Sequence, residues 1–148
     1  MKTYNFIGSD AANLVKPVSS RYSKLGTARD FYDYLLGVWC ANTCAPRMRD
    51  DWSTENPTLG QCSITAFLVQ DIYGGDVYGI LRPGGNYHCY NVIDGNLFDL
   101  TSEQFGQEAY ELSYENNPLQ LRQVHFAKEE KYQRYLYLKE KVEEYINA

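Results

Sequence analysis

The segment from residue 61 to residue 73 constrains the fold more than any other part of the chain. Its apolar side chains surround almost the whole circumference of a helical wheel: Ile64, Ala66, Phe67, Leu68, Val69 and Ile72. A helix that is apolar on nearly every side is stable only when other elements cover it. The segment ends at Gly74-Gly75, which allows the left-handed conformation with which helices commonly end. The sequence therefore predicts a central, buried helix.

The residues that follow this helix predict a small antiparallel sheet. Residues 77–81 and 87–93 are rich in apolar and aromatic side chains and flank the turn-forming residues 82–85, so we expect two paired strands. Asp94-Gly95 is a dipeptide favoured in two-residue hairpin turns, and it predicts a second hairpin into residues 97–100.

Further elements are expected on either side of this unit. Thr27 and Asp30 have the spacing of a capping box, and apolar residues follow at helical spacing, so we expect a helix to begin there. Residues 101–104 repeat the capping pattern and predict a short helix after the sheet. A last strand is expected at residues 119–126, before a long helix at residues 127–147.

The chain is expected to form one domain of the α+β class over residues 1–148. Its 148 residues, 44% of them hydrophobic, are sufficient for one core. Residues 1–26 predict a loosely structured lead-in with one short helix near residues 11–15. Residues 27–126 predict the α+β core, and residues 127–147 predict the C-terminal helix.

Charge and hydropathy narrow the classes of function. The net charge is -5, and the basic pair Arg47 and Arg49 is followed at once by Asp50 and Asp51, which argues against a nucleic-acid partner. The longest apolar stretch, residues 64–69, is far shorter than the roughly 20 residues that cross a bilayer. The first residues lack a signal-peptide pattern. We therefore expect a cytoplasmic protein with no membrane partner, whose four cysteines are reduced.

Cys62 is the candidate nucleophile because it stands at the start of the central helix. The unpaired N–H groups and the dipole of a helix N-terminus stabilise a thiolate. Gly60 has no side chain to block approach to the sulfur. Residues 41–59 are rich in Pro, Asn, Asp, Ser and Thr and predict one long loop, and loops of this length in compact domains are usually functional. We expect this loop to line a site at Cys62.

The register of the second hairpin predicts a partner for this cysteine. With a two-residue turn, Ile93 pairs with Asn96 and Tyr90 pairs with Asp99, so that Asp99 lies diagonal to His88 on one face. The carboxylate would then fix the tautomer of the imidazole and stabilise its charged form. The other ring nitrogen of His88 would remain for a cysteine thiol.

Nearby polar and aromatic residues are candidates for supporting roles. For an oxyanion we expect the backbone N–H of Cys62 and a side-chain amide as donors, with Gln61 and Asn56 as the alternatives. Trp52, in the loop before Cys62, is a candidate for substrate stacking or for the wall of the site. Asn91 is either a strand residue bonded to a loop backbone or a polar residue behind the site.

The remaining cysteines and the second histidine receive structural interpretations. Cys89 falls on the opposite face of the hairpin from His88, so we expect it to be buried and apolar in role. Cys40 and Cys44 lie four apart at a helix end and could bind a metal with another thiol or with His125, but zinc sites usually have tighter ligand pairs. We expect no metal and no cofactor, and an exposed or capping His125.

The order of cysteine, histidine and aspartate resembles a known thiol fold. Cys62, the strand His88-Cys-Tyr-Asn91 and the following Asp99-Leu-Thr101 resemble the transglutaminase-like branch of the papain-type fold. That pattern usually has an aromatic residue two positions after the histidine, and Tyr90 matches it as a further substrate-binding candidate. The resemblance implies a central helix that carries Cys62 and packs on a small antiparallel sheet. It gives catalytic roles to Cys62, His88 and Asp99.

A second resemblance covers roughly residues 30–142. The chain looks like the YunG-like family of small bacterial proteins at Trp52-Ser, Asn56-Pro57, Gly60-Gln61-Cys62, Gly74-Gly75, His88, Asn91, Asp99-Leu-Thr101, Gln104-Phe105 and Arg134-Tyr135 to Leu138. This resemblance implies a bacterial, cytoplasmic origin and names no substrate.

These observations lead to one expected function and two alternatives. The first is a cysteine-dependent amide or acyl hydrolase, or an acyl transferase, that acts through a thioester on Cys62. Its substrate would be a small molecule or a side-chain amide of a peptide or protein. The alternatives are a non-catalytic binding or regulatory domain that uses the same groove, and a metal-binding domain that uses the cysteines.

Overall fold

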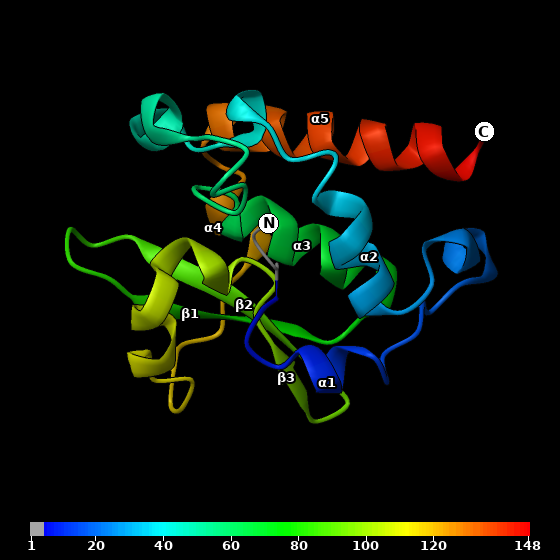
Figure 1. Ribbon diagram of the computed structural model, residues 1–148, viewed down its shortest axis with the longest axis horizontal. Coiled ribbons are helices and arrows are strands. Elements are labelled where there is room, and N and C mark those ends of the chain that lie inside the picture. Colours follow the sequence, from blue (N-terminus) through cyan, green and yellow to red (C-terminus); the bar gives the residue numbers. More distant parts are fainter. Residues whose placement is uncertain (1–4) are drawn as a thin grey trace.

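The computed structural model describes residues 5–148 and shows an α+β architecture (Figure 1). A small antiparallel sheet contains three strands in the order β1-β2-β3, which are Asp76–Leu81, Tyr87–Ile93 and Asn96–Phe98. The helix α3, Cys62–Tyr73, lies between this sheet and the C-terminal helix α5, Glu129–Ile146 (Figure 1). The predicted fold class, sheet and C-terminal helix are confirmed at this level.

The central helix is buried as its sequence predicts. Its apolar side chains, among them Ile64, Phe67 and Ile72, are at most 2% exposed and belong to the core. The helix ends at Gly74, whose φ of 83° lies in the region that favours glycine, and whose N–H bonds to the carbonyl of Gln70. Burial on all sides holds the first residue of α3 in a fixed position against the sheet.

The register of the sheet confirms the hairpin prediction. Ile93 pairs with Asn96 across the turn, and Asn91 pairs with Phe98. Asp94 and Gly95 both have positive φ, as a two-residue turn of this class requires. The ladder stops at Phe98, and Asp99 forms its bridge with Ile7 instead of pairing with Tyr90.

The N-terminal elements pack on the core rather than standing apart from it. The predicted helix near residues 11–15 lies earlier, as α1, Ser9–Ala12, and it is followed by the 3-10 helix η1, Ser20–Leu25. Phe6, Ala12, Val15 and Leu25 are buried. Helix α2, Ala28–Leu35, begins with the predicted capping box, in which Thr27 and Asp30 bond to each other's backbone N–H.

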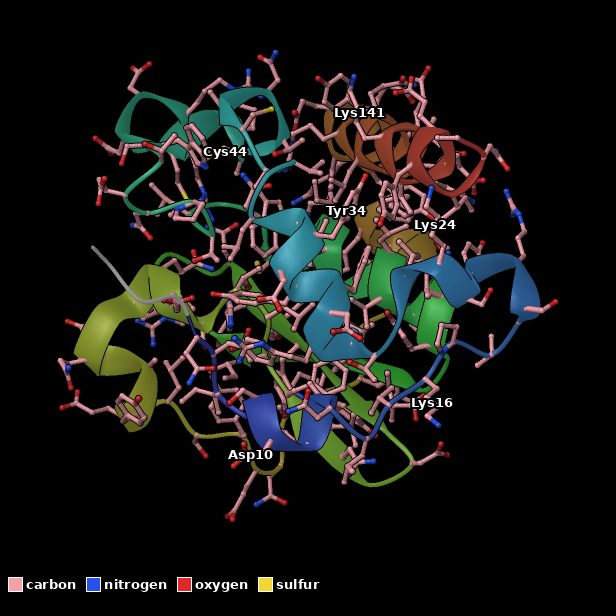
Figure 2. The ribbon with its side chains drawn as sticks, turned by 45° about the vertical axis from the view of Figure 1, so that its right-hand side comes forward. Asp10, Lys16, Lys24, Tyr34, Cys44 and Lys141 are labelled. Atoms are coloured by element: carbon pink, nitrogen blue, oxygen red, sulfur yellow. The ribbon has the colours of Figure 1, made fainter. Side chains whose placement is uncertain are left out.

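The segment at residues 41–59 contains two short turns of helix. The 3-10 helices η2, Ala41–Thr43, and η3, Pro46–Asp51, interrupt what the composition predicts as one loop. Figure 2 shows Cys44 in this part of the chain, which lies near α5. The segment ends at Gly60, where φ is 71° and an added Cβ would lie 2.5 Å from the sulfur of Cys44. Glycine is therefore required two residues before Cys62.

Two predictions about the later elements need correction. A helix follows the sheet at the predicted place, as the kinked 3-10 helix η4, Ser102–Glu111, but residues 101–104 do not form the predicted capping box, because the Thr101 hydroxyl bonds to Asp99. The predicted strand at 119–126 is reduced to two bonds with the edge of β1, and the chain then forms the helix α4, Arg122–His125. The Arg122 guanidinium bonds to α3 through the carbonyl of Phe67, which draws this segment away from the sheet.

None of the helices within residues 5–148 combines the length and apolar character needed to cross a membrane.

Asn91 fastens β2 to α3, so its loss should weaken the fold. The side-chain amide is 2% exposed and donates to the carbonyl of Ala66 at 2.9 Å. We expect Asn91→Ala to lower the free energy of unfolding by about 1–3 kcal/mol, because a buried hydrogen bond and its packing are lost. Urea denaturation measures this change. The control Asn96→Ala, at a half-buried position on β3, should change stability by less than about 0.5 kcal/mol, and an equal effect of both variants would contradict this role.

Candidate active site

Cys62 occupies the first turn of α3 and lies against the start of β2. The first intrahelical bond of α3 runs from the N–H of Thr65 to the carbonyl of Gln61, so the N–H of Cys62 lies before the intrahelical ladder begins. The sulfur is half-buried and lies 3.8 Å from the carbonyl oxygen of Tyr87. The thiol therefore lies in the first turn of the helix, as the sequence predicts, and next to the start of the middle strand β2.

His88 and Asp99 form a buried pair beside this thiol. The Nε2 atom of His88 lies 2.6 Å from Oδ2 of Asp99, and both side chains are at most 2% exposed. Because Nε2 faces the carboxylate, Nδ1 is the ring nitrogen that remains for another partner. Burial opposes a charge on the imidazole, but Asp99 and then Cys62 outweigh it and raise the pKa of His88 to about 10.

Tyr114 and Thr101 complete the surroundings of the Asp99 carboxylate. The Tyr114 hydroxyl donates to Oδ2 at 2.7 Å, and the backbone N–H of Thr101 donates to Oδ1 at 3.2 Å. Nothing in the sequence pattern indicates Tyr114, because it lies in a polar segment with no periodicity. Both contacts hold the carboxylate in the orientation that meets His88.

Cys89 and His88 are the two side chains that act most strongly on the pKa of the Cys62 thiol. The hydrogen bond from Cys89 is the largest influence on the Cys62 thiol, and with His88 it places the pKa of Cys62 well below its ordinary value although burial acts in the opposite direction. The same hydrogen bond and burial raise the pKa of Cys89. Cys62 is therefore the thiolate of the pair, and Cys89 is the neutral donor.

Cys89 is buried in the core, as expected, and it also has a polar contact that the sequence did not reveal. It is 1% exposed and belongs to the apolar cluster under the sheet. Alternation along β2 places Cys89 on the other face from His88. Both residues nevertheless act on the pKa of Cys62, because the N-terminal end of α3 lies against the start of β2 at Tyr87. The pattern of alternation alone cannot show that one helix terminus contacts two successive strand residues.

Cys62 and His88 line a cavity of about 1000 Å³, and Asp99 lies behind His88. Phe105 covers the imidazole edge-on, with 4.7 Å between the ring centroids. The guanidinium of Arg82 lies 4.9 Å from the centre of the Phe105 ring. The loop at residues 41–59 contributes residues 45–48 to the wall, in agreement with the expectation that this loop lines the site.

The structure does not bring the two predicted oxyanion amides to the wall of this cavity. The side chain of Gln61 is fully buried, and its Nε2 donates to the carbonyl of Cys40 at 3.2 Å. Asn56 is half-buried and also lies outside the lining residues. Gln104 is an amide on the wall itself, where its Oε1 accepts from the N–H of Gly60 at 3.4 Å.

The predicted substrate-binding residues lie behind the cavity and do not line it. Trp52 is half-buried and donates from Nε1 to the carbonyl of Pro57 at 3.0 Å. The Tyr90 hydroxyl donates to the carbonyl of Tyr114 at 3.2 Å, and Asn91 bonds to α3 as described above. Their contacts position the strands and the loop around the site.

His125 differs from the expectation of an exposed or capping residue. It is half-buried and lines the cavity, and its Nε2 lies 2.8 Å from Oε1 of Gln120. Its Nδ1 lies 2.9 Å from Nζ of Lys131. Burial and then the Lys131 charge lower the pKa of His125 to about 4, so its ring is neutral at pH 7 and accepts from the ammonium.

Cys40 and Cys44 are free thiols at the two ends of η2. Within residues 5–148, no group of three or more His, Cys, Asp or Glu side chains is arranged to hold a metal ion.

Comparison with known proteins gives a family. The family model described as YunG protein matches residues 27–147, a range that contains Cys62, His88 and Asp99. A relative from Bacillus subtilis (strain 168), described as the uncharacterized protein YunG, is 44% identical over 54 residues. This match covers 36% of the chain and 46% of the relative, so the chain spans less than half the length of this curated relative. No solved structure gives a significant match.

The two histidines of the chain should titrate on opposite sides of neutrality. Nitrogen-15 NMR of the imidazoles should show His125 losing its proton near pH 4 and His88 near pH 10. In Asp99→Asn the midpoint of His88 should fall by roughly 1–3 pH units, because a close opposite charge is lost. Asp76→Asn, at an exposed position on β1, should leave it unchanged. A His88 resonance that titrates near pH 6.5 in the wild type would contradict the buried ion pair.

Proposed function

We propose that this chain, which belongs to the YunG family, is a cysteine-dependent amide or acyl hydrolase or acyl transferase. One observation carries the proposal: Cys62 and His88 line the same cavity, and the Nε2 of this imidazole is held by Asp99 at 2.6 Å. A nucleophile, a base and an orienting carboxylate in contact are the parts that covalent acyl transfer requires.

The order of these parts along the fold supports a transglutaminase-like or papain-like assignment. The cysteine begins a buried helix, the histidine lies on the strand packed against that helix, and the aspartate follows the next strand. The same order occurs in the transglutaminase-like branch of the papain-type fold. We assign the chain to this group as part of the proposal.

The proposed first step forms a thioester. The Cys62 thiolate attacks the acyl carbon of an amide or ester, and the carbonyl π bond moves its electron pair to oxygen. In this step the backbone N–H of Cys62, the first residue of α3, donates to the oxyanion. As the tetrahedral intermediate collapses, the bond to the leaving amine or alcohol breaks, and the His88 imidazolium donates its proton to that group.

The second step releases the acyl group and restores the site. Water, or an amine in the case of transfer, attacks the thioester carbon and gives a proton to the neutral imidazole of His88. The sulfur leaves as the thiolate, so the thiolate and imidazolium forms are both recovered. Asp99 keeps its proton state throughout, since its role is to orient the ring and to stabilise its charge.

The volume of the cavity limits the size of the substrate. A volume of about 1000 Å³ is at the upper end of pockets that hold one small molecule. This volume supports a small acyl compound or a protruding side-chain amide rather than an extended polypeptide. The reduced thiols that such chemistry needs also support the expected cytoplasmic location.

Acetyl transfer from p-nitrophenyl acetate tests this function. We expect a burst of p-nitrophenolate, an acetyl group on Cys62 by peptide mass spectrometry, and slower turnover as the thioester hydrolyses. Cys62→Ala should abolish the burst, and His88→Gln should lower the acylation rate by roughly 10²–10⁴-fold, because general acid-base catalysis is lost.

Cys40→Ala is the matched control, because Cys40 is the other half-buried cysteine of the chain. This variant should retain the burst and the acetyl group on Cys62. Equal acetylation of Cys40 and Cys62, or a burst that survives in Cys62→Ala, would contradict the proposal and favour a binding domain that uses the same cavity.

A further inference from the structure

The charges around the cavity have a different balance from the charges of the whole chain. The chain has 14 Lys and Arg residues against 19 Asp and Glu residues, for a net charge of -5. The residues that line the cavity include Arg47, Arg82, Lys128, Lys131 and Arg134, and none of the Asp or Glu residues within residues 5–148 is among them. An acidic protein therefore surrounds its reactive sulfur with basic side chains.

These cations come from separate parts of the fold. Arg47 lies on η3, Arg82 in the turn between β1 and β2, and Lys131 on α5. Figure 1 shows η3 and the start of α5 above α3, and the turn between β1 and β2 at the left. Charges that converge from several elements create a positive potential in the cavity, and a wall of low dielectric strengthens it.

Lys131 is the cation whose surroundings point most directly to a ligand. Its ammonium is half-buried and donates to the neutral imidazole of His125, which leaves its positive charge uncompensated by that contact. Burial lowers the pKa of Lys131, whereas the charge of the Cys62 thiolate raises it, so the two groups act on each other across the cavity. An anionic group placed here would gain a charge-assisted hydrogen bond.

Arg82 and Arg134 occupy different situations. The Arg82 guanidinium stacks on Phe105, which in turn lies edge-on to His88, so Phe105 holds this cation near the imidazole. Arg134 is 7% exposed and is already bonded to Glu130 at 2.7 Å. Arg47 and Lys128 are exposed, whereas Arg82 and Lys131 are half-buried. Removal of Arg82 or Lys131 should therefore change the potential at the sulfur most, without the loss of the ion pair that removal of Arg134 would cause.

We infer that the acyl substrate of Cys62 carries a negative charge, which Lys131 and Arg82 bind within the basic cavity. This inference rests on the proposed function for its acyl chemistry, and it adds the substrate class: a small amide or ester that bears a carboxylate or phosphate group. The positive wall attracts such a compound and orients its reacting carbonyl toward the thiolate.

The test compares two alkylating reagents that differ in charge. Iodoacetate and iodoacetamide both attach to a thiolate by displacement of iodide, and only iodoacetate is anionic. Peptide mass spectrometry gives the rate constant at Cys62 for each reagent at low ionic strength. The ratio of the two rates is divided by the same ratio for N-acetylcysteinamide, a neutral model thiol. This normalised ratio measures the preference of the cavity for an anion.

We expect a normalised ratio of about ten or more in the wild type, because a focused positive field raises the encounter rate with anions by this order. Lys131→Gln and Arg82→Gln should each lower the ratio several-fold, whereas Lys131→Arg should retain it. Lys141→Gln is the matched control: Lys141 is an exposed lysine of α5 that lies outside the cavity lining and is labelled in Figure 2. This variant should leave the ratio unchanged. Added salt should lower the ratio.

A protection experiment distinguishes the two anionic groups. Inorganic phosphate and succinate are each tested for slowing iodoacetamide at Cys62, against sodium chloride at the same ionic strength. Stronger protection by phosphate assigns the site to phosphate-bearing substrates, and stronger protection by succinate assigns it to carboxylates. Protection by neither beyond that of sodium chloride would overturn the inference.

The two rates keep this inference separate from the proposed function. Fast reaction with iodoacetamide and a normalised ratio near one, or a ratio unchanged in both Gln variants, would overturn the anionic substrate and leave the thiol nucleophile standing. A high ratio with an iodoacetamide rate no faster than that of the model thiol would support anion binding in the cavity and would contradict the nucleophile.

Discussion

A carboxylate removed from water must find hydrogen-bond donors within the protein, and the fully buried Asp99 is the group around which the site is arranged. Three donors come from different elements: His88 from β2, Tyr114 from the loop after η4, and Thr101 from the residue before η4. The backbone N–H of Asp99 also bonds to Ile7 near the N-terminus. Asp99 therefore joins four separate parts of the chain, three through its carboxylate and one through its backbone N–H. The carboxylate also fixes the orientation of the His88 imidazole.

The same charge explains how two neighbouring thiols acquire different roles. Asp99 keeps His88 protonated, and the imidazolium together with the Cys89 thiol favours the thiolate at Cys62. Cys89 lies in the core, where burial disfavours a second negative charge. The helix terminus, the imidazolium and the neutral thiol thus act together on Cys62, and this combination is the physical basis of the acyl-transfer function that we propose.

Local patterns in the sequence were sufficient to predict the parts of the fold that depend on neighbours in the chain. The apolar circumference of α3, its end at Gly74 and the register across Asp94-Gly95 depend on periodicity and turn chemistry, and all three are confirmed. The strand predicted at 119–126 failed because Arg122 bonds to α3, a contact between segments far apart in sequence.

The site was predictable only in part, for the same reason. The sequence predicted that His88 and Asp99 lie close together, and they do, although Asp99 lies one residue beyond the paired part of the hairpin. The position of Cys62 follows from the start of a helix. Tyr114 lies in a polar segment, and Lys131 lies on an amphipathic helix. No local sequence pattern indicates that either residue contacts the site. The positive cavity depends on cations from separate elements, so it becomes visible only when the chain is folded.

The charge state of the Cys62 sulfur is the centre of this account, and the ultraviolet absorbance of the thiolate measures it directly. The difference spectrum between the wild type and Cys62→Ser, followed as a function of pH, isolates this sulfur from the other three cysteines. We expect a thiolate signal whose midpoint lies well below pH 8.5, because the pKa of Cys62 is lowered from its ordinary value. A signal that emerges only near pH 8.5, the ordinary pKa of a cysteine, would contradict the thiolate and with it the proposed nucleophile.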